Sequence, residues 1–361
     1  MSQFSKRKTI GKALLTGVAA AWLAIAGGAG PAHAASAVVL YTADGLEDFY
    51  KAILVNFEKK TGSRVNIVTS GSGAVVNRLQ TEKDSPKADV LVTLPPFVQT
   101  AVKDGLLESY KSSADSAIPA SRKDPNGYWA TFVDDYASFI YNPKLAKAPE
   151  TFEDLLKPEY KGQVSYSNPI TAGDGMAVVI LLEKLWGEDK AFAYLAKLEQ
   201  DVKFHTKGTG YLDTLVGRGE IKVANGDIQM DMDDKVHGGL AIEPTFLRPA
   251  PGQQPVTFSL PYAIALVKGG PNPAGGKALI DYLLSKEVQA KVTDVFGLPA
   301  RDDVQPTGAN AKAILAAVKD VKVVEVDWNH VLEKQKAWQE RWRSEVIGAS
   351  NKPIEVVKPN G

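Results

Sequence analysis

Three short segments of the chain combine glycine with hydroxyl side chains, a composition that suits an anion-binding loop. Glycine lets backbone N–H groups approach a ligand closely, a hydroxyl adds a further donor, and the start of a helix carries a partial positive charge. Each segment lies directly before an expected helix, and the three are Ser70-Gly71-Ser72-Gly73, Thr171-Ala172-Gly173-Asp174-Gly175 and Lys207-Gly208-Thr209-Gly210. Together they predict donors for a phosphoryl or carboxyl group. A plain strand-to-helix turn explains the first segment equally well, and capping by Thr209 is the favoured interpretation of the third.

The first of these loops is not a dinucleotide-binding motif. Gly71, Ser72 and Gly73 begin the pattern G-x-G-x-x-G, but Val76 occupies the position of the third glycine. The strand that follows also lacks the acidic residue that would bind a ribose. We therefore reject a Rossmann-type cofactor site.

Three aspartates at the ends of expected strands or the starts of expected helices could bind a cationic group. They are Asp44, Asp174 and Asp227. Each also has a structural interpretation, since Asp44 and Asp174 could cap helices and Asp227 could lie in a turn. As a set with the glycine loops, they would give one cleft both N–H donors and carboxylate acceptors. That combination matches a zwitterionic ligand.

Other polar residues give weaker signals. Tyr136 and Tyr262 lie at predicted sheet ends, where a tyrosine can contact a ligand, although most tyrosines at such places belong to the core. The acidic group Asp231, Asp233 and Asp234 lacks the glycine and the terminal glutamate of a calcium loop. We interpret it as a turn or a solvated acidic face.

The sequence offers no activated nucleophile and no metal-binding pattern. It contains no cysteine, and only His205, His237 and His330 follow the leader described below, none of them in an H-E-x-x-H spacing. Neither a G-x-S-x-G motif nor a Walker loop occurs. We therefore expect no catalytic residue, no metal site and no cofactor, and a binding protein rather than an enzyme.

Residues 1–34 are typical of a secretory signal peptide. Four basic residues precede an apolar run over residues 13–26, and Ala32-His33-Ala34 supplies an A-x-A cleavage signal. The run is shorter than the roughly 20 apolar residues that a membrane span requires. No cysteine stands at the cleavage point to carry a lipid anchor. We expect export to the periplasm of a Gram-negative bacterium.

The charge balance changes when the leader is removed. The sequence of 361 residues has 42 Lys and Arg against 42 Asp and Glu, a formal net charge of zero. The leader carries four basic residues and no acid, so the remaining chain would have 38 basic and 42 acidic residues, a net charge of −4. This balance argues against a nucleic-acid-binding protein.

Strand and helix signals alternate along the chain after the leader. The period of the apolar residues predicts strands at 37–41, 65–69 and 89–93, helices at 45–60 and 74–83, a strand at 137–141 that opens a second region, and a long strand at 259–267. The β-α-β-α-β order predicts an α/β fold. We expect two α/β lobes, each a mainly parallel sheet flanked by helices, with hinge strands that cross twice and a ligand cleft between the lobes. The first lobe should comprise residues 35–134 and 260–302, and the second residues 135–259 and 303–361.

With these motifs in place, the chain resembles the periplasmic 2-aminoethylphosphonate-binding proteins of ABC importers, which have the type II periplasmic binding protein fold. The resemblance covers nearly the whole chain after the leader. Its more specific segments are Gly71-Ser72-Gly73-Ala74-Val75-Val76, Val90-Leu91-Val92-Thr93 with Pro95-Pro96-Phe97, and Val223-Ala224-Asn225-Gly226-Asp227. Ser72 departs from the pattern, because the family has an all-glycine loop there, and its hydroxyl could alter the contact with the anion.

The resemblance implies that separate groups hold the two ends of the ligand. The phosphonate would contact Ser70, Gly71, Ser72, Gly73, Ala74 and Thr93 of the first lobe and Thr171, Ala172 and Gly173 of the second. The ammonium would face one or more of Asp44, Asp174 and Asp227, with Tyr136 or Tyr262 along the carbon chain. The implied partners are this small ligand and an inner-membrane ABC permease, with no nucleic acid, and the protein is expected to be a monomer.

Other ligands and another class remain as alternatives. A ferric-iron binder of the same fold commonly has two adjacent tyrosines, and this sequence has none. A polyamine binder would need acids and aromatic residues without anion-binding loops. An exported enzyme acting on small phosphorylated compounds is the alternative from a different class.

Overall fold

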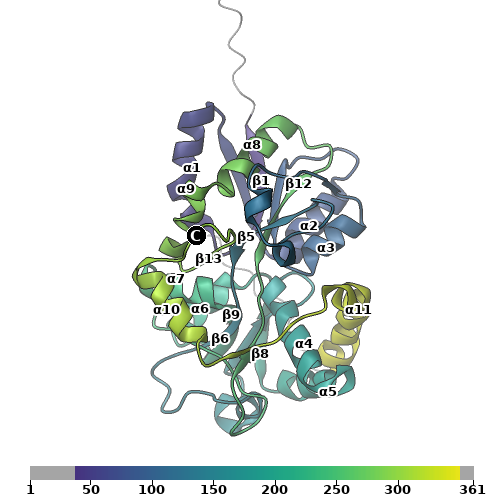
Figure 1. Ribbon diagram of the computed structural model, residues 1–361. Coiled ribbons are helices and arrows are strands. Elements are labelled where there is room, and N and C mark those ends of the chain that lie inside the picture. Colours follow the sequence, from purple (N-terminus) through teal and green to yellow (C-terminus); the bar gives the residue numbers. More distant parts are fainter. Residues whose placement is uncertain (1–36, 350–361) are drawn as a thin grey trace, which may run out of the picture. The chain divides into compact units, whose positions relative to one another are not determined.

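The computed structural model describes residues 37–349, so the predicted signal peptide lies outside the described residues. The described chain forms two α/β lobes, each built on one sheet (Figure 1). The sheet of the first lobe has the strand order β13-β5-β12-β3-β1-β2, with β4 beside β12. The sheet of the second lobe has the order β10-β6-β9-β7-β8. This confirms the predicted fold class.

The first lobe takes its elements from two stretches of the chain. Its strands are β1 (Val38–Ala43), β2 (Val65–Ser70), β3 (Val90–Thr93), β4 (Leu107–Glu108), β5 (Ala130–Asp134), β12 (Tyr262–Val267) and β13 (Leu298–Pro299). Its helices are α1 (Glu47–Thr61), α2 (Ser72–Thr81), α3 (Phe97–Lys103), α8 (Pro273–Leu283) and α9 (Lys286–Gln289). Short 3-10 turns cover Asp115–Ala117, Ala120–Arg122 and Val292–Val295.

The second lobe holds the middle of the chain and its C-terminal helices. Its strands are β6 (Ala137–Tyr141), β7 (Val164–Ser167), β8 (Val202–Thr206), β9 (Val223–Asp227) and β10 (Glu243–Thr245), with a separate ladder of β11 (Val256–Thr257) and β14 (Lys322–Val323). Its helices are α4 (Gly173–Trp186), α5 (Glu188–Glu199), α6 (Gly210–Gly217), α7 (Ile228–Val236), α10 (Gly308–Val318) and α11 (Trp328–Arg341), and α11 continues as a π-helical turn over Trp342–Val346. Further 3-10 turns cover Phe152–Leu156, Pro158–Tyr160 and Ile347–Ala349.

The local sequence explains where the first helices begin and end. In α1 the buried side chains recur at helical spacing, from Phe49 through Ile53 to Phe57, so that one face packs on the sheet. Gly62 ends this helix in the left-handed conformation, with φ 73°, and its N–H donates to the carbonyl of Glu58. Helix α2 begins at Ser72, two residues before the predicted start, because Gly71 is already its N-cap.

Both sheets are mixed rather than mainly parallel. Strand β1 runs parallel to β2 and β3, whereas β12 runs antiparallel to β3 and β5. In the second lobe β7 is parallel to β8 and β9, but β6 is antiparallel to β9 and β10. The antiparallel pairs arise because β12 and β6 enter their sheets directly from the other lobe, without the crossover helix that a parallel pair requires.

The chain passes between the sheets at three places. Residues 135–136 join β5 to β6, residues 258–261 join β11 to β12, and residues 300–307 lead from β13 to α10. The first two passages are the expected hinge crossings. The exact lobe boundaries stay a prediction.

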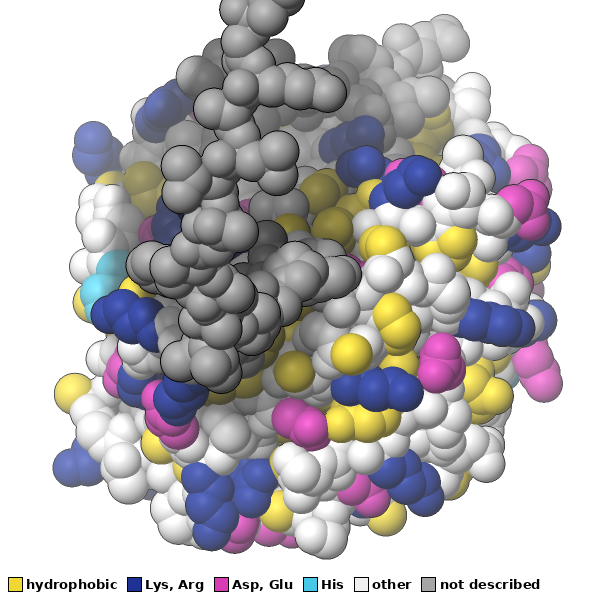
Figure 2. All heavy atoms as spheres, turned by 90° about the horizontal axis from the view of Figure 1, so that it is seen from above, with side chains coloured by type: hydrophobic (Ala, Val, Ile, Leu, Met, Phe, Trp, Pro, Cys, Tyr) yellow, Lys and Arg dark blue, Asp and Glu magenta, His cyan; other side chains and the backbone are white. Residues whose placement is uncertain are grey.

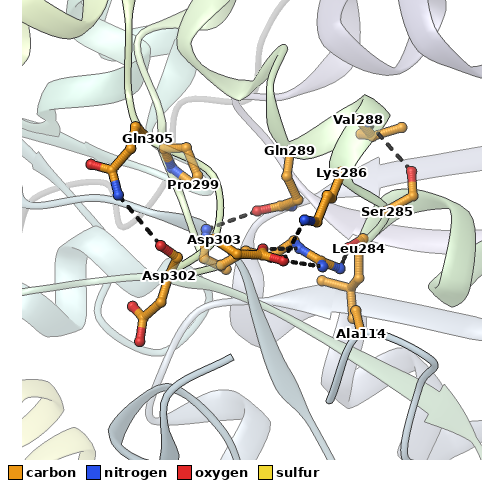
Figure 3. Close-up of polar contacts among 12 residues, drawn as sticks. Ala114, Leu284, Ser285, Lys286, Val288, Gln289, Pro299, Asp302, Asp303 and Gln305 are labelled. Atoms are coloured by element: carbon orange, nitrogen blue, oxygen red, sulfur yellow. Dashed lines mark hydrogen bonds and ion pairs between the residues drawn. The ribbon is translucent and has the colours of Figure 1, made fainter. Parts of the chain in front are cut away.

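Polar contacts around Asp303 anchor the third passage to the first lobe (Figure 3). The guanidinium of Arg301 donates to both carboxylate oxygens of Asp303, at 2.8 and 3.0 Å, and the ammonium of Lys286 lies 2.9 Å from the same carboxylate. These two cations hold the pKa of Asp303 well below its usual value. Next to them, the amide oxygen of Gln289 accepts a hydrogen bond from the N–H of Ala300 at 2.8 Å.

Helix α11 lies beside α4 and α5 (Figure 1). Trp338 and Trp342 are both fully buried, and the indole N–H of Trp342 donates to the hydroxyl of Tyr166 at 2.7 Å. These tryptophans therefore anchor the helix rather than line a ligand site. Among residues 37–349, no helix combines the length and the apolar character that crossing a membrane requires. On the face seen in Figure 2, basic and acidic side chains are interspersed, as the near balance of charges leads one to expect.

Candidate ligand-binding site between the two lobes

A cavity of about 520 Å³ is lined by residues of both lobes. It lies at the carboxyl ends of β1, β2 and β8, which is the edge where open α/β sheets bind their ligands. The lining residues are Asp44, Gly45, Glu47, Asp48, Thr69, Ser70 and Gly71 from the first lobe, and Thr206, Lys207, Gly208, Gly210, Tyr211, Thr214, Met230, Asp233 and Asp234 from the second.

The lining of this cavity is strongly acidic. Lys207 is the one basic residue beside five carboxylates, which belong to Asp44, Glu47, Asp48, Asp233 and Asp234. Burial, and next the charge of Asp44, raise the pKa of Glu47. Such a lining favours a cationic group. Within residues 37–349, no group of three or more His, Asp or Glu side chains is arranged to hold a metal ion.

Asp44 links the two lobes through its side chain. Its Oδ2 atom accepts hydrogen bonds from the backbone N–H groups of Thr209 at 2.9 Å and Gly210 at 3.1 Å, at the start of α6. Asp44 thus does not cap its own following helix, whose N-cap residue is Leu46. The predicted capping of the third glycine loop by Thr209 is wrong, because the Thr209 side chain makes no capping bond and its hydroxyl donates to Asp174 instead, at 2.8 Å.

The first two glycine loops contact each other across the lobes. The N–H groups of Gly73 and Ala74 both donate to the carbonyl of Thr171, at 2.9 and 3.3 Å. A Cβ atom on Gly71 would lie 2.4 Å from that carbonyl oxygen, and one on Gly73 would lie 2.4 Å from the carbonyl oxygen of Ile170. Glycine is therefore required at both positions by the close approach of the second lobe.

A buried network at the hinge joins Tyr262 to two aspartates. The Tyr262 hydroxyl lies 3.0 Å from the carbonyl oxygen of Asp44 and 3.2 Å from the Oδ2 atom of Asp227. Asp227 is the N-cap of α7, since its Oδ1 accepts from the N–H of Met230 at 2.8 Å. Burial, and then the charge of Asp227, raise the pKa of Asp135 well above its ordinary value, and Asp135 also accepts from the N–H of Gln229 at 3.0 Å.

Two more aspartates are buried behind the cavity in the second lobe. Burial and the charge of Asp227 raise the pKa of Asp174 well above its usual range. Asp231 has no exposed surface and accepts a hydrogen bond from the hydroxyl of Ser138. The interpretation of Asp231, Asp233 and Asp234 as a turn is wrong, because all three lie in α7. A solvated face is wrong for Asp231, which faces the interior, whereas Asp233 and Asp234 are partly exposed and line the cavity.

The structure separates the predicted site residues into two groups. Asp44, Ser70 and Gly71 line the cavity. The others do not belong to its lining. Ser72, Gly73, Ala74, Thr93, Thr171, Ala172, Gly173, Asp174, Asp227 and Tyr262 lie where the two lobes meet or directly behind it, and Tyr136 lies on the hinge, paired with Ser259. Their role in binding stays a prediction.

Several lining residues were not expected from the sequence. Glu47 and Asp48 occupy the first turn of α1, where acids are common for helix stability alone. Asp233 and Asp234 lie in α7, just after its buried residues Ile228 to Asp231. Lys207 lies in the third glycine segment, whose composition indicates backbone donors rather than a role for the lysine side chain. The available signal was the position of these residues next to strand ends, which is too general to single them out.

The described geometry defines a two-lobed α/β binding protein with its ligand cavity between the lobes. The family of bacterial extracellular solute-binding proteins matches residues 85–334. A periplasmic protein of Salmonella paratyphi A, provisionally named for binding 2-aminoethylphosphonate, is 40% identical over 86% of this chain and 93% of its own length. An Fe(3+)-binding periplasmic protein of Serratia marcescens is 29% identical over 55% of this chain and 58% of its own.

Solved structures agree with this fold. The periplasmic binding protein AfuA of Actinobacillus pleuropneumoniae, solved with fructose-6-phosphate, is 22% identical and superposes with a TM-score of 0.75, covering 86% of this chain and 99% of that protein. The chain belongs to the family of bacterial extracellular solute-binding proteins, which bind small molecules for ABC importers and are not enzymes. The resemblance to the 2-aminoethylphosphonate-binding periplasmic proteins, first seen in the motifs, is confirmed.

Proposed function

We propose that this protein captures 2-aminoethylphosphonate in the periplasm and delivers it to an inner-membrane ABC permease. The observation that carries the proposal is the composition of the interlobe site, which places glycine-rich backbone donors beside a set of carboxylates. A ligand with one anionic and one cationic end needs both. The similarity to relatives named for this ligand supports the same choice.

In the proposed complex, the phosphonate lies between the two glycine loops. Ser70 to Ala74 and Thr93 supply donors from the first lobe, and Thr171 to Gly173 supply them from the second. Because the N–H groups of Gly73 and Ala74 donate to the Thr171 carbonyl in the present arrangement, these loops must separate slightly to admit the anion. Each charge-assisted hydrogen bond then contributes about 1.5–3 kcal/mol.

The ammonium end lies on the acidic side of the same site. Asp44, Asp174 and Asp227 are its proposed partners, and Tyr262 or Tyr136 contacts the short carbon chain. Both hydrogen bonds of the Asp44 carboxylate go to Oδ2, and Oδ1 accepts none from the described part of the chain. Oδ1 is therefore the atom of Asp44 that we assign to the ammonium.

A ligand with cationic groups only, such as a polyamine, is the second candidate. The observation in its favour is the excess of five carboxylates over the single lysine in the cavity. No observation at this site favours an iron complex, since the sequence has no adjacent tyrosines and the described residues contain no group of three or more His, Asp or Glu arranged for a metal ion.

The test is calorimetric titration of the purified, ligand-stripped protein. The ligands are 2-aminoethylphosphonate, methylphosphonate, inorganic phosphate, spermidine and ferric citrate. We expect saturable binding of 2-aminoethylphosphonate that exceeds the binding of all the others. If 2-aminoethylphosphonate does not bind measurably while spermidine or ferric citrate does, the proposal is contradicted. The protein would then be a binding protein for the ligand that binds.

One substitution tests the proposed division of the site. Asp174→Ala should weaken the binding of 2-aminoethylphosphonate much more than the binding of methylphosphonate, because only the former ligand has an ammonium group. Asp104→Asn is the control, because it also removes one carboxylate, but at an exposed position of the first lobe. Equal losses for the two phosphonates would show that Asp174 has only a structural role.

Export, partner and assembly complete the proposal. The protein isolated from the periplasm of a Gram-negative host should begin at Ala35, as N-terminal sequencing can show. Light scattering should give the mass of a monomer. Ligand-loaded protein should stimulate ATP hydrolysis by its permease in membranes more than unloaded protein does.

A further inference from the structure

The contact between Asp44 and α6 has a form that is unusual for a helix start. The first N–H groups of a helix require an acceptor, which is normally a side chain within the same local segment. Here Thr209, the N-cap residue of α6, makes no such bond. The acceptor is the Asp44 carboxylate, which lies 165 residues earlier in the chain and belongs to the first lobe.

The second lobe is shaped to admit this carboxylate. A Cβ atom on Gly208 would lie only 2.6 Å from Oδ2 of Asp44. Any other residue at position 208 would therefore push the carboxylate away from the helix start. A negative charge at this end of α6 also interacts favourably with the partial positive charge of the helix dipole.

The backbone of Asp44 is fixed on the opposite side. Its carbonyl oxygen accepts from the hydroxyl of Tyr262, at 3.0 Å, in the first lobe's strand β12. The neighbouring Gly45 N–H donates to the side chain of Glu47 at 2.9 Å. The carboxylate therefore projects from a turn whose backbone is held in place. Its hydrogen bonds to α6 thus connect the two lobes directly.

We infer that Asp44 is an interlobe clasp, an internal anion that holds the start of α6 against the first lobe and so sets how far the protein closes before any ligand binds. The inference concerns the two lobes alone and does not depend on which ligand the cavity takes. Its failure would leave the proposed function standing, because the test below contains no ligand.

The clasp can be tested by measuring the distance between the lobes in solution. The chain has no cysteine, so spin labels can be attached at only two introduced sites. Lys83→Cys in the first lobe and Lys197→Cys in the second replace exposed side chains. Double electron–electron resonance then gives the interlobe distance distribution of the ligand-free protein.

Two substitutions remove the clasp from opposite sides. Asp44→Ala deletes the carboxylate, and Gly208→Ala keeps it but blocks its approach to the helix. Both should move the distribution to longer distances and lower the ratio of closed to open protein about tenfold, since a single charge-assisted hydrogen bond is worth that factor or more. Asp104→Asn, an exposed first-lobe position, should leave the distribution unchanged.

The two variants together keep the inference falsifiable. If Asp44→Ala does not fold, as judged by circular dichroism and a cooperative thermal transition, Gly208→Ala alone decides the question. An unchanged distribution in Gly208→Ala would overturn the clasp, even if Asp44→Ala had opened the protein, because the carboxylate would then act elsewhere. A shift in both variants, with the control unchanged, is the expected result.

Discussion

At the scale of single residues, the second lobe buries carboxyl groups that have no lysine or arginine partner among the described residues. Asp174, Asp213, Asp227 and Asp231 are all of this kind. Burial, and then the charges of Asp231 and Asp234, raise the pKa of Asp213 well above its ordinary value. A carboxyl group of raised pKa stabilises the folded state only while it is protonated.

We predict that Asp213→Asn flattens the dependence of stability on pH. At about pH 3 and below, the carboxyl group is mostly protonated in both the folded and the unfolded chain. As the pH rises, the unfolded chain ionises first, so the free energy of unfolding falls until the pH passes the raised pKa of the folded protein. Asparagine cannot ionise. At pH 8 the variant should therefore be more stable than the parent, because only the parent loses stability by ionisation of the unfolded chain.

Urea denaturation at several pH values between about 3 and about 8, a range that brackets ordinary carboxyl titration at about pH 4, measures this difference. The advantage of the variant should vanish toward the acid end. Asp104→Asn, which changes the same charge at an exposed position, should track the parent throughout. Parallel curves for Asp213→Asn and the parent would show that Asp213 is ionised in the folded protein.

The hydroxyl of Tyr262 offers a second test at this scale. One hydroxyl hydrogen serves two acceptors, the Asp44 carbonyl and the Asp227 carboxylate. Tyr262→Phe keeps the buried ring but removes the donor, and we expect it to lower the free energy of unfolding by about 1–2 kcal/mol. Tyr141→Phe, whose hydroxyl makes no hydrogen bond within the described chain, is the matched control. Equal stability of the two variants in urea would contradict the role of this hydroxyl.

At the scale of elements, local pattern predicted the first lobe well. The alternation of apolar runs gave β1, α1, β2, α2 and β3 in their observed order, because each run buries one face against the same sheet. Strand ends then indicated Asp44 and the Ser70–Gly71 turn as site residues, and both line the cavity. Information of this kind lies within a few residues of each element.

What could not be predicted depends on pairs that are distant in sequence. From the local sequence, the acidic segment of α7 has the composition of a solvated turn. The burial of Asp231 could not be predicted, because its hydrogen-bond partner Ser138 lies 93 residues away. The mixed character of the sheets follows from where β6 and β12 enter them, which no local period reveals. The acceptor of the α6 N–H groups was missed for the same reason.

The C-terminal helix provides the prediction for a single element. Trp342 is fully buried, and its indole donates to Tyr166, so α11 is held on the second lobe at this point. Trp342→Ala should cost about 3–5 kcal/mol of unfolding free energy, and Trp342→Phe less, because the ring packing is largely kept. Leu315→Ala, at an exposed position of α10, is the control. Urea transitions that coincide for Trp342→Ala and Leu315→Ala would contradict this anchoring role.

At the scale of the whole molecule, charge opposes the anionic end of the proposed ligand. The chain after the predicted leader carries a net charge of −4, and five of its carboxylates line the cavity beside one lysine. In the proposed complex, affinity for the phosphonate therefore comes from local donors, the backbone N–H groups and hydroxyls of the two glycine loops. Preference for an aminophosphonate over a simple phosphonate then rests on attraction between its ammonium and the carboxylates.

This origin of selectivity predicts a dependence on salt. Raising the ionic strength from about 0.01 M to about 0.15 M shortens the screening length from about 30 Å to about 8 Å. Screening weakens the attraction of the ammonium and also relieves the repulsion of the phosphonate. For 2-aminoethylphosphonate the two effects oppose each other, whereas methylphosphonate experiences only the relief. The ratio of their affinities, measured by titration calorimetry at both salt concentrations, should therefore fall as salt rises. A ratio independent of salt would mean that the site selects its ligand by shape, with the carboxylates serving the fold alone.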